Sequence, residues 1–241
     1  MDGAAALRRQ GISFNISITM KSTTVAEAGA KHKPRGRPRS FDREQALEQA
    51  MEVFWRKGFD ATSISDLTEA MGINPPSLYA AFGDKEKLYL EAVEFYRVQR
   101  GEHIREVMAA EPTARGAIEK ALREAVSEFS RRDCPAGCLL TMSTSCVGVS
   151  VGIQQTLAKK RAMGRDRMRE RIQRGIEEGD VPASTDPLAL AEFIMTVFAG
   201  MAMHVRDGAS RKALNATVDN AMRAFPEVVR KPSRKRSTAA A

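Results

Sequence analysis

Apolar residues recur at helical spacing over most of this chain, from Phe41 to about Phe225, and this periodicity constrains its fold more than any other feature. Alternating strand patterns and the tight turns of strand hairpins are scarce in the same region. Glycine and proline residues interrupt the periodic segments where helices would end or begin. The sequence therefore predicts an all-α protein.

The composition indicates a folded, soluble chain. Of its 241 residues, 43% are apolar and 28% are charged, which is enough for a hydrophobic core. No uninterrupted run of about 18 apolar residues is present, so we expect neither a membrane-spanning helix nor a membrane partner. The three cysteines, Cys134, Cys138 and Cys146, lie too close together for the disulfide framework of a secreted protein. We therefore expect a cytoplasmic location.

The net charge of +8 is concentrated at the two ends of the chain. Residues 1–41 have a net charge of +6 and residues 226–241 a net charge of +4, which leaves −2 for residues 42–225. Lysine and arginine displace counterions from a phosphate backbone without a fixed geometry. Nucleic acid is therefore the expected partner, ahead of a membrane surface.

The N-terminal part of the periodic region predicts three short helices, over residues 42–58, 62–72 and 75–82. Pro75 and Pro76 require a helix to start there, because proline is tolerated only in the first helical turn. The residues that cap or end these helices are Asp42, Gly58, Thr62 or Ser63, Gly72 and Gly83.

Two short helices joined by a tight turn at Gly72 are typical of a helix-turn-helix, whose second helix fits the DNA major groove. Leu67, Leu78 and Phe82 are expected to lock the helices together, while small residues such as Ala80 let the second helix approach the bases. An ordinary helical corner is the alternative interpretation.

Longer helices follow. One begins after Asp84, another after Pro112, and the rest are expected near residues 139–147, 150–178, 187–207 and 210–225. The helix after Pro187 is apolar around much of its circumference, which predicts a neighbour from a second copy of the chain. The predicted domains are a disordered basic arm (1–40), a DNA-binding head (41–101), an effector-binding and dimerisation body (102–225) and a disordered basic tail (226–241).

Three segments resemble the N-terminal domain of TetR/AcrR-type transcriptional regulators: FWRKGFDATS at 54–63, the short helix 64–72, and SLYAAFGDKEKL at 77–88. The resemblance implies an all-helical homodimer with a three-helix DNA-binding head and a C-terminal body that binds an effector and dimerises. It implies a ligand-responsive regulator, with a repressor expected, that binds a palindromic operator and is released by a small molecule. No cofactor is implied.

By position, the resemblance implies that five residues contact phosphates or base edges: Thr62, Ser63, Ser77, Tyr79 and Lys85. Tyr79 has the reach for a phosphate oxygen, and Lys85 sits at a helix N-terminus that already favours an anion. Many relatives have a polar or basic residue and a glycine where this chain has Pro75 and Pro76. Apolar contact with a thymine methyl is the contact left open to those prolines.

The two basic ends have different expected roles. Arg35, Arg37 and Arg39 lie directly before the head and suit the narrow minor groove of A·T-rich DNA. A solvated charge run is the alternative. The C-terminal residues 230–236 have a similar composition without that position, so we expect at most nonspecific attraction to DNA.

The body offers weaker signals. Residues 159–174 hold eight Lys/Arg and two acids, which we interpret as a solvated helix face, with an anion-binding effector wall as the alternative. The residues expected to line an effector pocket are Phe95, Met108, Cys138, Met142 and Val149. The three cysteines are expected in the core, and thiol or oxidant sensing is the alternative for them.

Other functional classes lack support. The chain has no nucleophile elbow, phosphate-binding glycine loop or cluster of metal ligands, so we expect neither an enzyme nor a metal site. A nonspecific DNA-packaging protein remains an alternative because of the basic termini. Such a protein would bind random and operator DNA alike.

Overall fold

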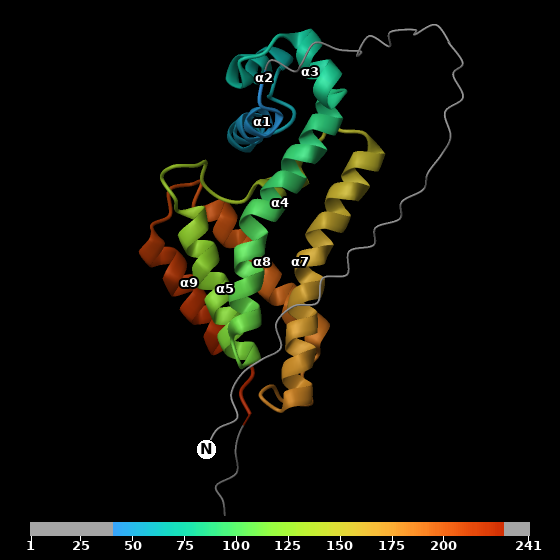
Figure 1. The fold of residues 1–241 in the computed structure, drawn as a ribbon. Coiled ribbons are helices and arrows are strands. Elements are labelled where there is room, and N and C mark those ends of the chain that lie inside the picture. The colour runs from blue at the N-terminus through green and yellow to red at the C-terminus, as the bar shows by residue number, and fades with distance from the viewer. Residues whose placement is uncertain (1–40, 229–241) are drawn as a thin grey trace, which may run out of the picture. The chain divides into compact units, whose positions relative to one another are not determined.

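Helices make up the whole fold of residues 41–228, the part of the chain that the computed structural model describes (Figure 1). Within this range there is no strand, and the predicted all-α class is confirmed. The basic arm 1–40, with Arg35, Arg37 and Arg39, and the tail after residue 228 lie outside the described residues.

The head consists of three helices and the start of a fourth. They are α1 (Arg43–Lys57), α2 (Ile64–Met71), α3 (Pro75–Phe82) and α4 (Lys85–Ala110). The three short helices match the predicted ranges closely. Helix α4 runs without a break across the predicted boundary between residues 101 and 102, so the head and the body share it.

Side-chain caps explain why the short helices start where they do. Asp42 accepts hydrogen bonds from the backbone of α1, and Asn74 accepts one from Ser77 N in α3. Of the two candidates for the cap of α2, Ser63 is the one used, in a reciprocal capping box with Asp66. Gly72 ends α2 with φ +62°, in the left-handed region that favours glycine.

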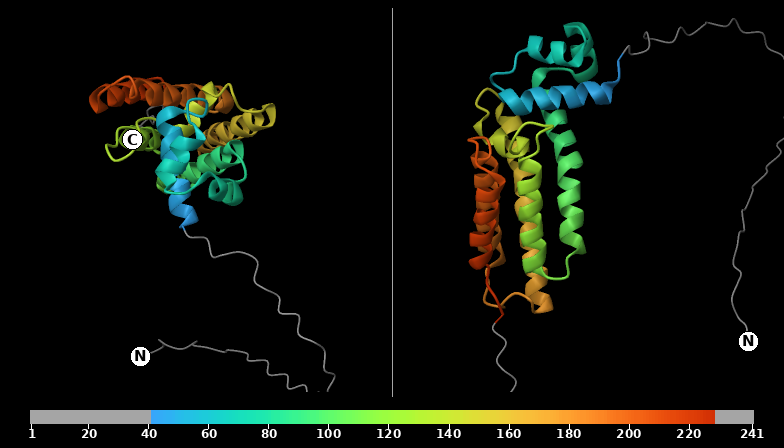
Figure 2. Two further views of the ribbon diagram at one scale, coloured as in Figure 1. Left: turned by 90° about the horizontal axis from the view of Figure 1, so that it is seen from above. Right: turned by 90° about the vertical axis from the view of Figure 1, so that its left-hand side faces the viewer.

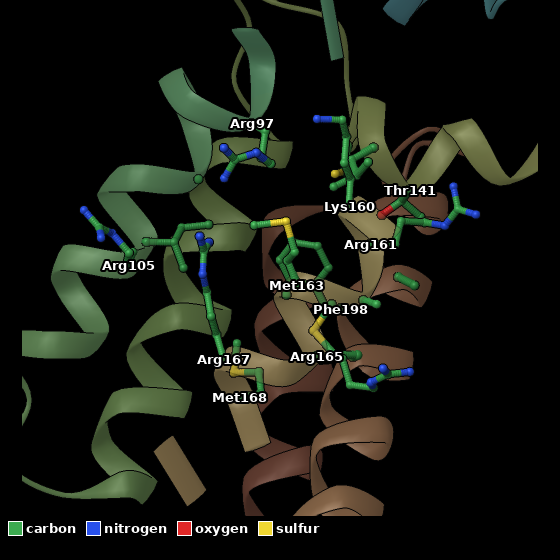
Figure 3. A pocket seen from close by; sticks show the side chains of 18 of the residues that line it. Arg97, Arg105, Thr141, Lys160, Arg161, Met163, Arg165, Arg167, Met168 and Phe198 are labelled. Carbon is green, nitrogen blue, oxygen red and sulfur yellow. The ribbon is translucent and has the colours of Figure 1, made fainter. Parts of the chain in front are cut away.

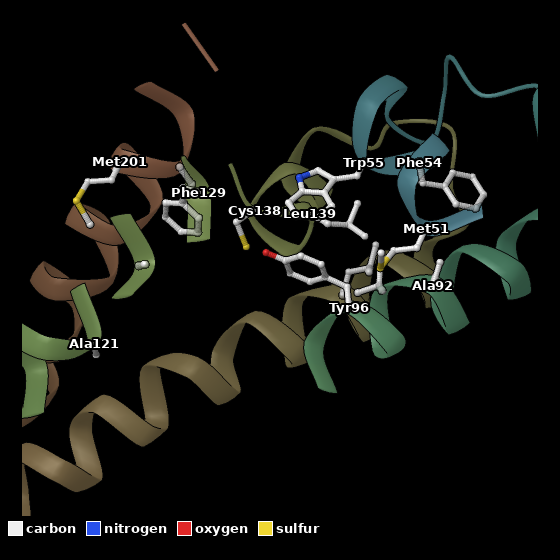
Figure 4. Close-up of a cluster of buried hydrophobic side chains, with 14 of the residues drawn as sticks. Met51, Phe54, Trp55, Ala92, Tyr96, Ala121, Phe129, Cys138, Leu139 and Met201 are labelled. Carbon is white, nitrogen blue, oxygen red and sulfur yellow. The ribbon is translucent and has the colours of Figure 1, made fainter. Parts of the chain in front are cut away.

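The core of the head is aromatic (Figure 4). Leu67, Leu78 and Phe82 are buried as predicted. The Phe54 and Tyr89 rings pack edge to face with centroids 4.9 Å apart, which joins α1 to α4. Trp55 on α1 packs against Tyr96 on α4 in the same way, with ring centroids 4.8 Å apart.

The body adds five α-helices and one turn of 3-10 helix to the distal part of α4. They are α5 (Ala114–Phe129), α6 (Leu139–Met142), η1 (Ser143–Ser145), α7 (Val151–Glu178), α8 (Pro187–His204) and α9 (Arg211–Arg223). Helix α5 contacts α4, α7, α8 and α9, and so forms the centre of the bundle (Figures 1 and 2). Helix α1 packs across α4 at the other end.

One predicted helix is interrupted. A single helix was expected over residues 139–147, but α6 ends at Met142 and the chain continues as η1. The hydroxyl of Ser143 donates to Leu140 O at 2.6 Å, and that of Thr144 donates to Thr141 O at 2.9 Å. These side chains compete for backbone carbonyls and so favour a tight turn over a regular helix.

Helix α8 keeps an apolar surface that residues 41–228 do not cover. Leu188, Phe193 and Met203 are 46%, 40% and 45% exposed. Alone among the helices of residues 41–228, α8 is long and apolar enough to cross a membrane by length and composition. A packed helix of a soluble bundle passes the same test, and α8 contacts both α7 and α9.

Candidate DNA interface and effector cavity

The outer face of α3 gathers several of the predicted DNA contacts. Pro75, Pro76, Tyr79 and Ala80 are all exposed, and their spacing places them on one side of the helix. Leu78 lies on the opposite side and is fully buried. Tyr79 is 48% exposed, so its hydroxyl is available to a partner. Ser77 is half-buried beside this face.

The other predicted DNA contacts are placed less simply. Thr62 is buried, and its hydroxyl donates to Gly58 O at 2.6 Å, so its side chain is not exposed on this face. Ser63 is exposed but already accepts a hydrogen bond from Asp66 N at 3.0 Å. Lys85 is half-buried, with its Nζ 4.2 Å from the centroid of the Phe59 ring. A cation–π contact of this kind holds the ammonium against the head rather than in solvent.

The recognition segment itself has no basic side chain. Between Lys57 and Lys85 the sequence has no lysine or arginine and has four acids, Asp60, Asp66, Glu69 and Asp84. Lys57 pairs with Asp66 at 2.7 Å, and this contact lowers the pKa of the Asp66 carboxyl to about 2. Lys87, which was not among the predicted contacts, lies exposed beside Asp84 at 3.1 Å. Most of the positive charge needed to hold DNA must therefore come from outside α2 and α3.

Two carboxylates of the head hold the loop that leads into α7, which we call the junction loop (residues 146–150). Asp60 accepts from Val147 N at 3.0 Å and from Gly148 N at 2.7 Å. Glu86 accepts from the backbone N–H of Ser150 at 2.6 Å and from its hydroxyl at 3.0 Å. Hydrogen bonds to ionised acceptors are the stronger kind, so the start of α7 is tied firmly to the head.

A cavity of about 830 Å³, partly open to solvent, lies between α4, α5, α6, α7 and α8 of the body (Figure 3). Apolar side chains from all of these helices line it, among them Ile104, Met108, Phe129, Leu140, Met163 and Phe198. A volume and lining of this kind suit a small molecule with an apolar body.

The cavity wall is also strongly basic. Helix α7 provides six of its cations, Lys160, Arg161, Arg165, Arg167, Arg171 and Arg174, and α4 provides Arg97, Arg100 and Arg105. Only three acids line the same space, Glu128, Glu170 and Glu192. The run at residues 159–174 was interpreted as a solvated helix face, with an anion-binding wall as the alternative. Lys159, Arg169 and Arg174 are exposed, and six of the eight cations of the run line the cavity.

Ion pairs fix part of this wall. Glu94 on α4 pairs with both Arg97 and Lys160, and so links α4 to α7. Hydrogen bonds from these two cations, Arg97 first, lower the pKa of the Glu94 carboxyl to about 2. Arg100 pairs with Glu128 on α5 at 3.2 Å.

Two of the five predicted pocket residues, Met108 and Cys138, line the cavity. The other three do not, because their side chains are used elsewhere. Val149 is buried in the core at the junction loop, Phe95 packs against the core from a half-buried position, and Met142 lies half-buried at the end of α6. The basic residues were missed as cavity residues because a charged run gives no sign of which side of a helix is covered.

The cysteines are all free thiols. Cys138 is buried, and burial raises the pKa of the Cys134 thiol. Cys146 Sγ lies 3.2 Å from the hydroxyl of Tyr89, whose pKa is raised by burial. Within residues 41–228, no group of three or more His, Cys, Asp or Glu side chains is placed to hold a metal ion.

Comparison with known proteins identifies the family. Residues 46–92 match the pattern described as "Bacterial regulatory proteins, tetR family", and residues 115–225 match "Tetracyclin repressor-like, C-terminal domain". The chain is 33% identical over 201 residues to the HTH-type transcriptional repressor ComR of Escherichia coli K12, which covers 82% of this chain and 95% of ComR. The chain belongs to the TetR family. It is therefore a helix-turn-helix transcriptional regulator and not an enzyme, as predicted.

Other members of the TetR family support the assignment. The HTH-type transcriptional repressor BdcR of Escherichia coli K12 is 29% identical over 197 residues, which cover 80% of this chain and 94% of BdcR. A cysteine mutant of the TetR family regulator CifR, solved in complex with 26-base-pair operator DNA, is 42% identical with a TM-score of 0.76. That match covers 79% of this chain and all of the CifR chain. The reduced form of E. coli NemR, at 18% identity and a TM-score of 0.69, shares the fold.

Proposed function

We propose that this TetR family member is a ligand-responsive repressor that binds a palindromic operator as a homodimer. The exposed face of α3, with Pro75, Pro76, Tyr79 and Ala80, is the observation that carries the proposal. Two such helices, one per subunit, would enter successive major grooves about one DNA turn apart. A small molecule in the cavity would favour the free state by binding it more tightly than the DNA-bound state.

The relatives support the DNA and repressor parts of this proposal. ComR and BdcR are named as repressors, and CifR has been solved on double-stranded operator DNA. Ser77 and Ser63 join the contacts beside the α3 face, and Lys85 is a weaker candidate because its ammonium lies on the Phe59 ring. Nonspecific packaging of DNA is disfavoured, because a dedicated recognition face would then have no use.

Helix α8 supports the homodimer. Leu188, Phe193 and Met203 leave an apolar stripe open on its surface. A second copy that covers the same stripe would form a two-fold symmetric interface. The proposed division of labour is a head of residues 41–101 for DNA and a body of residues 102–225 for effector and dimer, in a cytoplasmic protein.

The junction loop provides a route between the two functions. Helix α7 forms much of the cavity wall, and its first residue follows directly on Ser150, which is bonded to Glu86 of the head. A ligand that displaces α7 would therefore pull on the head through Glu86 and Asp60. This change would alter the separation of the two α3 helices in the dimer.

A gel-shift assay with DNA from the promoter region of its own gene tests the proposal. Tyr79→Ala is expected to weaken binding about tenfold, the lower end of the effect of losing one positioned contact, with a smaller loss for Tyr79→Phe. Gln173→Ala, on the exposed side of α7, is the control and should leave binding unchanged. Equal affinity for promoter and random DNA, or no effect of Tyr79→Ala, would contradict the proposal.

The environment of Cys146 favours oxidant sensing as a second candidate. It is half-buried, touches Tyr89 and begins the junction loop, whereas Cys138 is buried and the pKa of Cys134 is raised. Oxidation to a sulfenic acid at Cys146 would push against Tyr89 and disturb the loop. We then expect peroxide to reduce DNA binding in the wild type and in Cys138→Ser, but not in Cys146→Ser.

A further inference from the structure

We infer that the cavity of the body selects an organic anion: a molecule with an apolar chain or ring system and one carboxylate or sulfonate group. This inference rests on the proposed role of the cavity as an effector site, and adds the chemical class of the effector. It depends on the cavity wall, where cations exceed acids by nine to three.

Ion pairs within the described residues give seven of the nine lining cations a carboxylate partner and leave two without one. Arg161 and Arg167 line the cavity and have no carboxylate partner in residues 41–228. The guanidinium of Arg161 donates to the neutral hydroxyl of Ser143 at 2.6 Å. Cationic groups beside an apolar wall and without a counter-charge are costly, and a bound anion would relieve that cost.

Arg171 provides an independent observation. It lines the cavity with only 7% of its surface exposed. One of its terminal nitrogens donates to the carbonyls of Glu111 and Pro112, at 3.3 and 3.1 Å. Its Nε and Nη1 are buried and have no hydrogen-bond partner, and the nearest carboxylate, on Glu178, lies 3.9 Å from Nη1. Buried guanidinium donors are normally satisfied, so this wall lacks an acceptor.

The rest of the cavity defines the remainder of the ligand. Met163, Met168, Met195 and Phe198 lie on the α7 and α8 sides, and thioethers adapt to irregular apolar shapes. Figure 3 shows Met163 and Phe198 in the middle of the site with Arg97, Arg105 and Arg167 around them. Gly101 of α4 lines the same space, and a Cβ built there would meet no other atom within 4 Å. The site therefore has apolar volume next to unpaired cations.

A matched pair of fluorescent probes tests the inference on the full chain. 8-Anilinonaphthalene-1-sulfonate has an apolar ring system with one sulfonate, and N-phenyl-1-naphthylamine has the same rings without it. We expect the sulfonate probe to bind at least tenfold more tightly than the neutral probe. Dodecanoate should displace it at concentrations at least tenfold lower than dodecanol does.

Variants locate the binding in the cavity. Arg167→Gln and Arg161→Gln should each weaken the sulfonate probe about five- to tenfold and leave the neutral probe unchanged. Arg169→Gln is the control, because Arg169 is an exposed arginine of the same helix that does not line the cavity. Gly101→Leu, which fills the open volume, should weaken both probes alike.

Three results would overturn the inference: equal affinity for the two probes, no binding of the sulfonate probe or dodecanoate, or an equal loss with Arg169→Gln. The same samples are tested for promoter DNA binding both without and with the probe. Specific DNA binding by a protein that fails to prefer the anion would refute this inference and leave the DNA-binding proposal intact. Anion binding that leaves the DNA affinity unchanged would support the site and refute its proposed role as the effector switch.

Discussion

Helix α3 and helix α7 place their charges in opposite ways. The recognition segment around α3 meets a polyanion and has no lysine or arginine between residues 57 and 85. Helix α7 belongs to the body, and six of its cations line a cavity. The exposed face of α3 therefore has no positive charge of its own, whereas the cavity wall has nine cations. Within residues 41–228, the density of basic residues alone would therefore point to the cavity wall and not to α3.

Leu78→Ala should have the largest effect, and it should distinguish most clearly between the DNA-binding head and the cavity of the body. Leu78 is fully buried under α3, so its truncation should cost about 2–5 kcal/mol of stability and remove promoter binding. The cavity lies on residues from Tyr96 onward, so binding of the sulfonate probe should survive. Hydrogen exchange of the head amides measures the stability. If Leu78→Ala abolished probe binding as well as promoter binding, the head and the cavity would not be independent of each other.

Deletion of residues 1–39 should have the next largest effect. These residues contain eight lysines and arginines, while the recognition segment contains none. We expect a loss of about 100-fold in promoter affinity and a shallower dependence on salt, because fewer counterions are released. Gel shifts at several salt concentrations measure both. An unchanged salt slope would show that the charge for DNA comes from residues after position 39. A loss that is equal on A·T-rich and G·C-rich flanks would exclude minor-groove reading by Arg35, Arg37 and Arg39.

Glu86→Gln should have a moderate effect on the link between the two regions. The substitution keeps the shape of the side chain but removes the charge that accepts from Ser150 N and Oγ. We expect the free energy of unfolding to fall by about 1 kcal/mol and promoter affinity to fall a few-fold. Glu48→Gln, at an exposed position on α1, is the control in denaturant melts and gel shifts. Identical behaviour of the two variants would remove Glu86 from the coupling route.

The acid dependence of the cavity wall should be the smallest effect. The pKa of Glu94 is about 2 in the fold against an ordinary value of 4.5. Its stabilising contribution is therefore present above about pH 4.5 and is lost as the pH falls toward 2. Because Glu94 is 40% exposed, solvent screening limits this contribution to below about 1 kcal/mol. Thermal melts between pH 6 and pH 3 should show a smaller decline for Glu94→Gln than for the wild type. A decline of the same size in both proteins would exclude this role.

Much of the fold follows from local sequence signals. The bounds of the short helices depend on residues next to them in the sequence. These are caps such as Asp42, Ser63 and Asp84, and the glycines that follow the helices. Leu67 and Leu78 were identified as core from their spacing alone and are fully buried. The break after Met142 was missed. The hydroxyls of Ser143 and Thr144 compete with helical N–H groups for backbone carbonyls, and the spacing of apolar residues contains no sign of this competition.

The candidate sites were less predictable, because they depend on contacts between distant residues. Thr62 matched the family pattern, yet its hydroxyl is used by Gly58 O. Asp60 and Glu86 hold a loop that lies 64 to 88 residues further along the chain, and no local pattern indicates such a contact. The basic run on α7 looks the same in sequence whether it faces solvent or a cavity. Only the packing of α4, α5 and α8 around it distinguishes the two.

The hydrogen bonds at Gly148 have a consequence for protein engineering. A Cβ at this position would lie 2.3 Å from Asp60 Oδ1, so any other residue there would push the carboxylate away. A chimeric sensor that fuses this head to the ligand-binding half of another regulator would need a residue without a side chain at the matching position. It would also need free peptide N–H groups that face Asp60 and Glu86. A few backbone atoms of the junction loop therefore restrict which heads and ligand-binding halves can be combined.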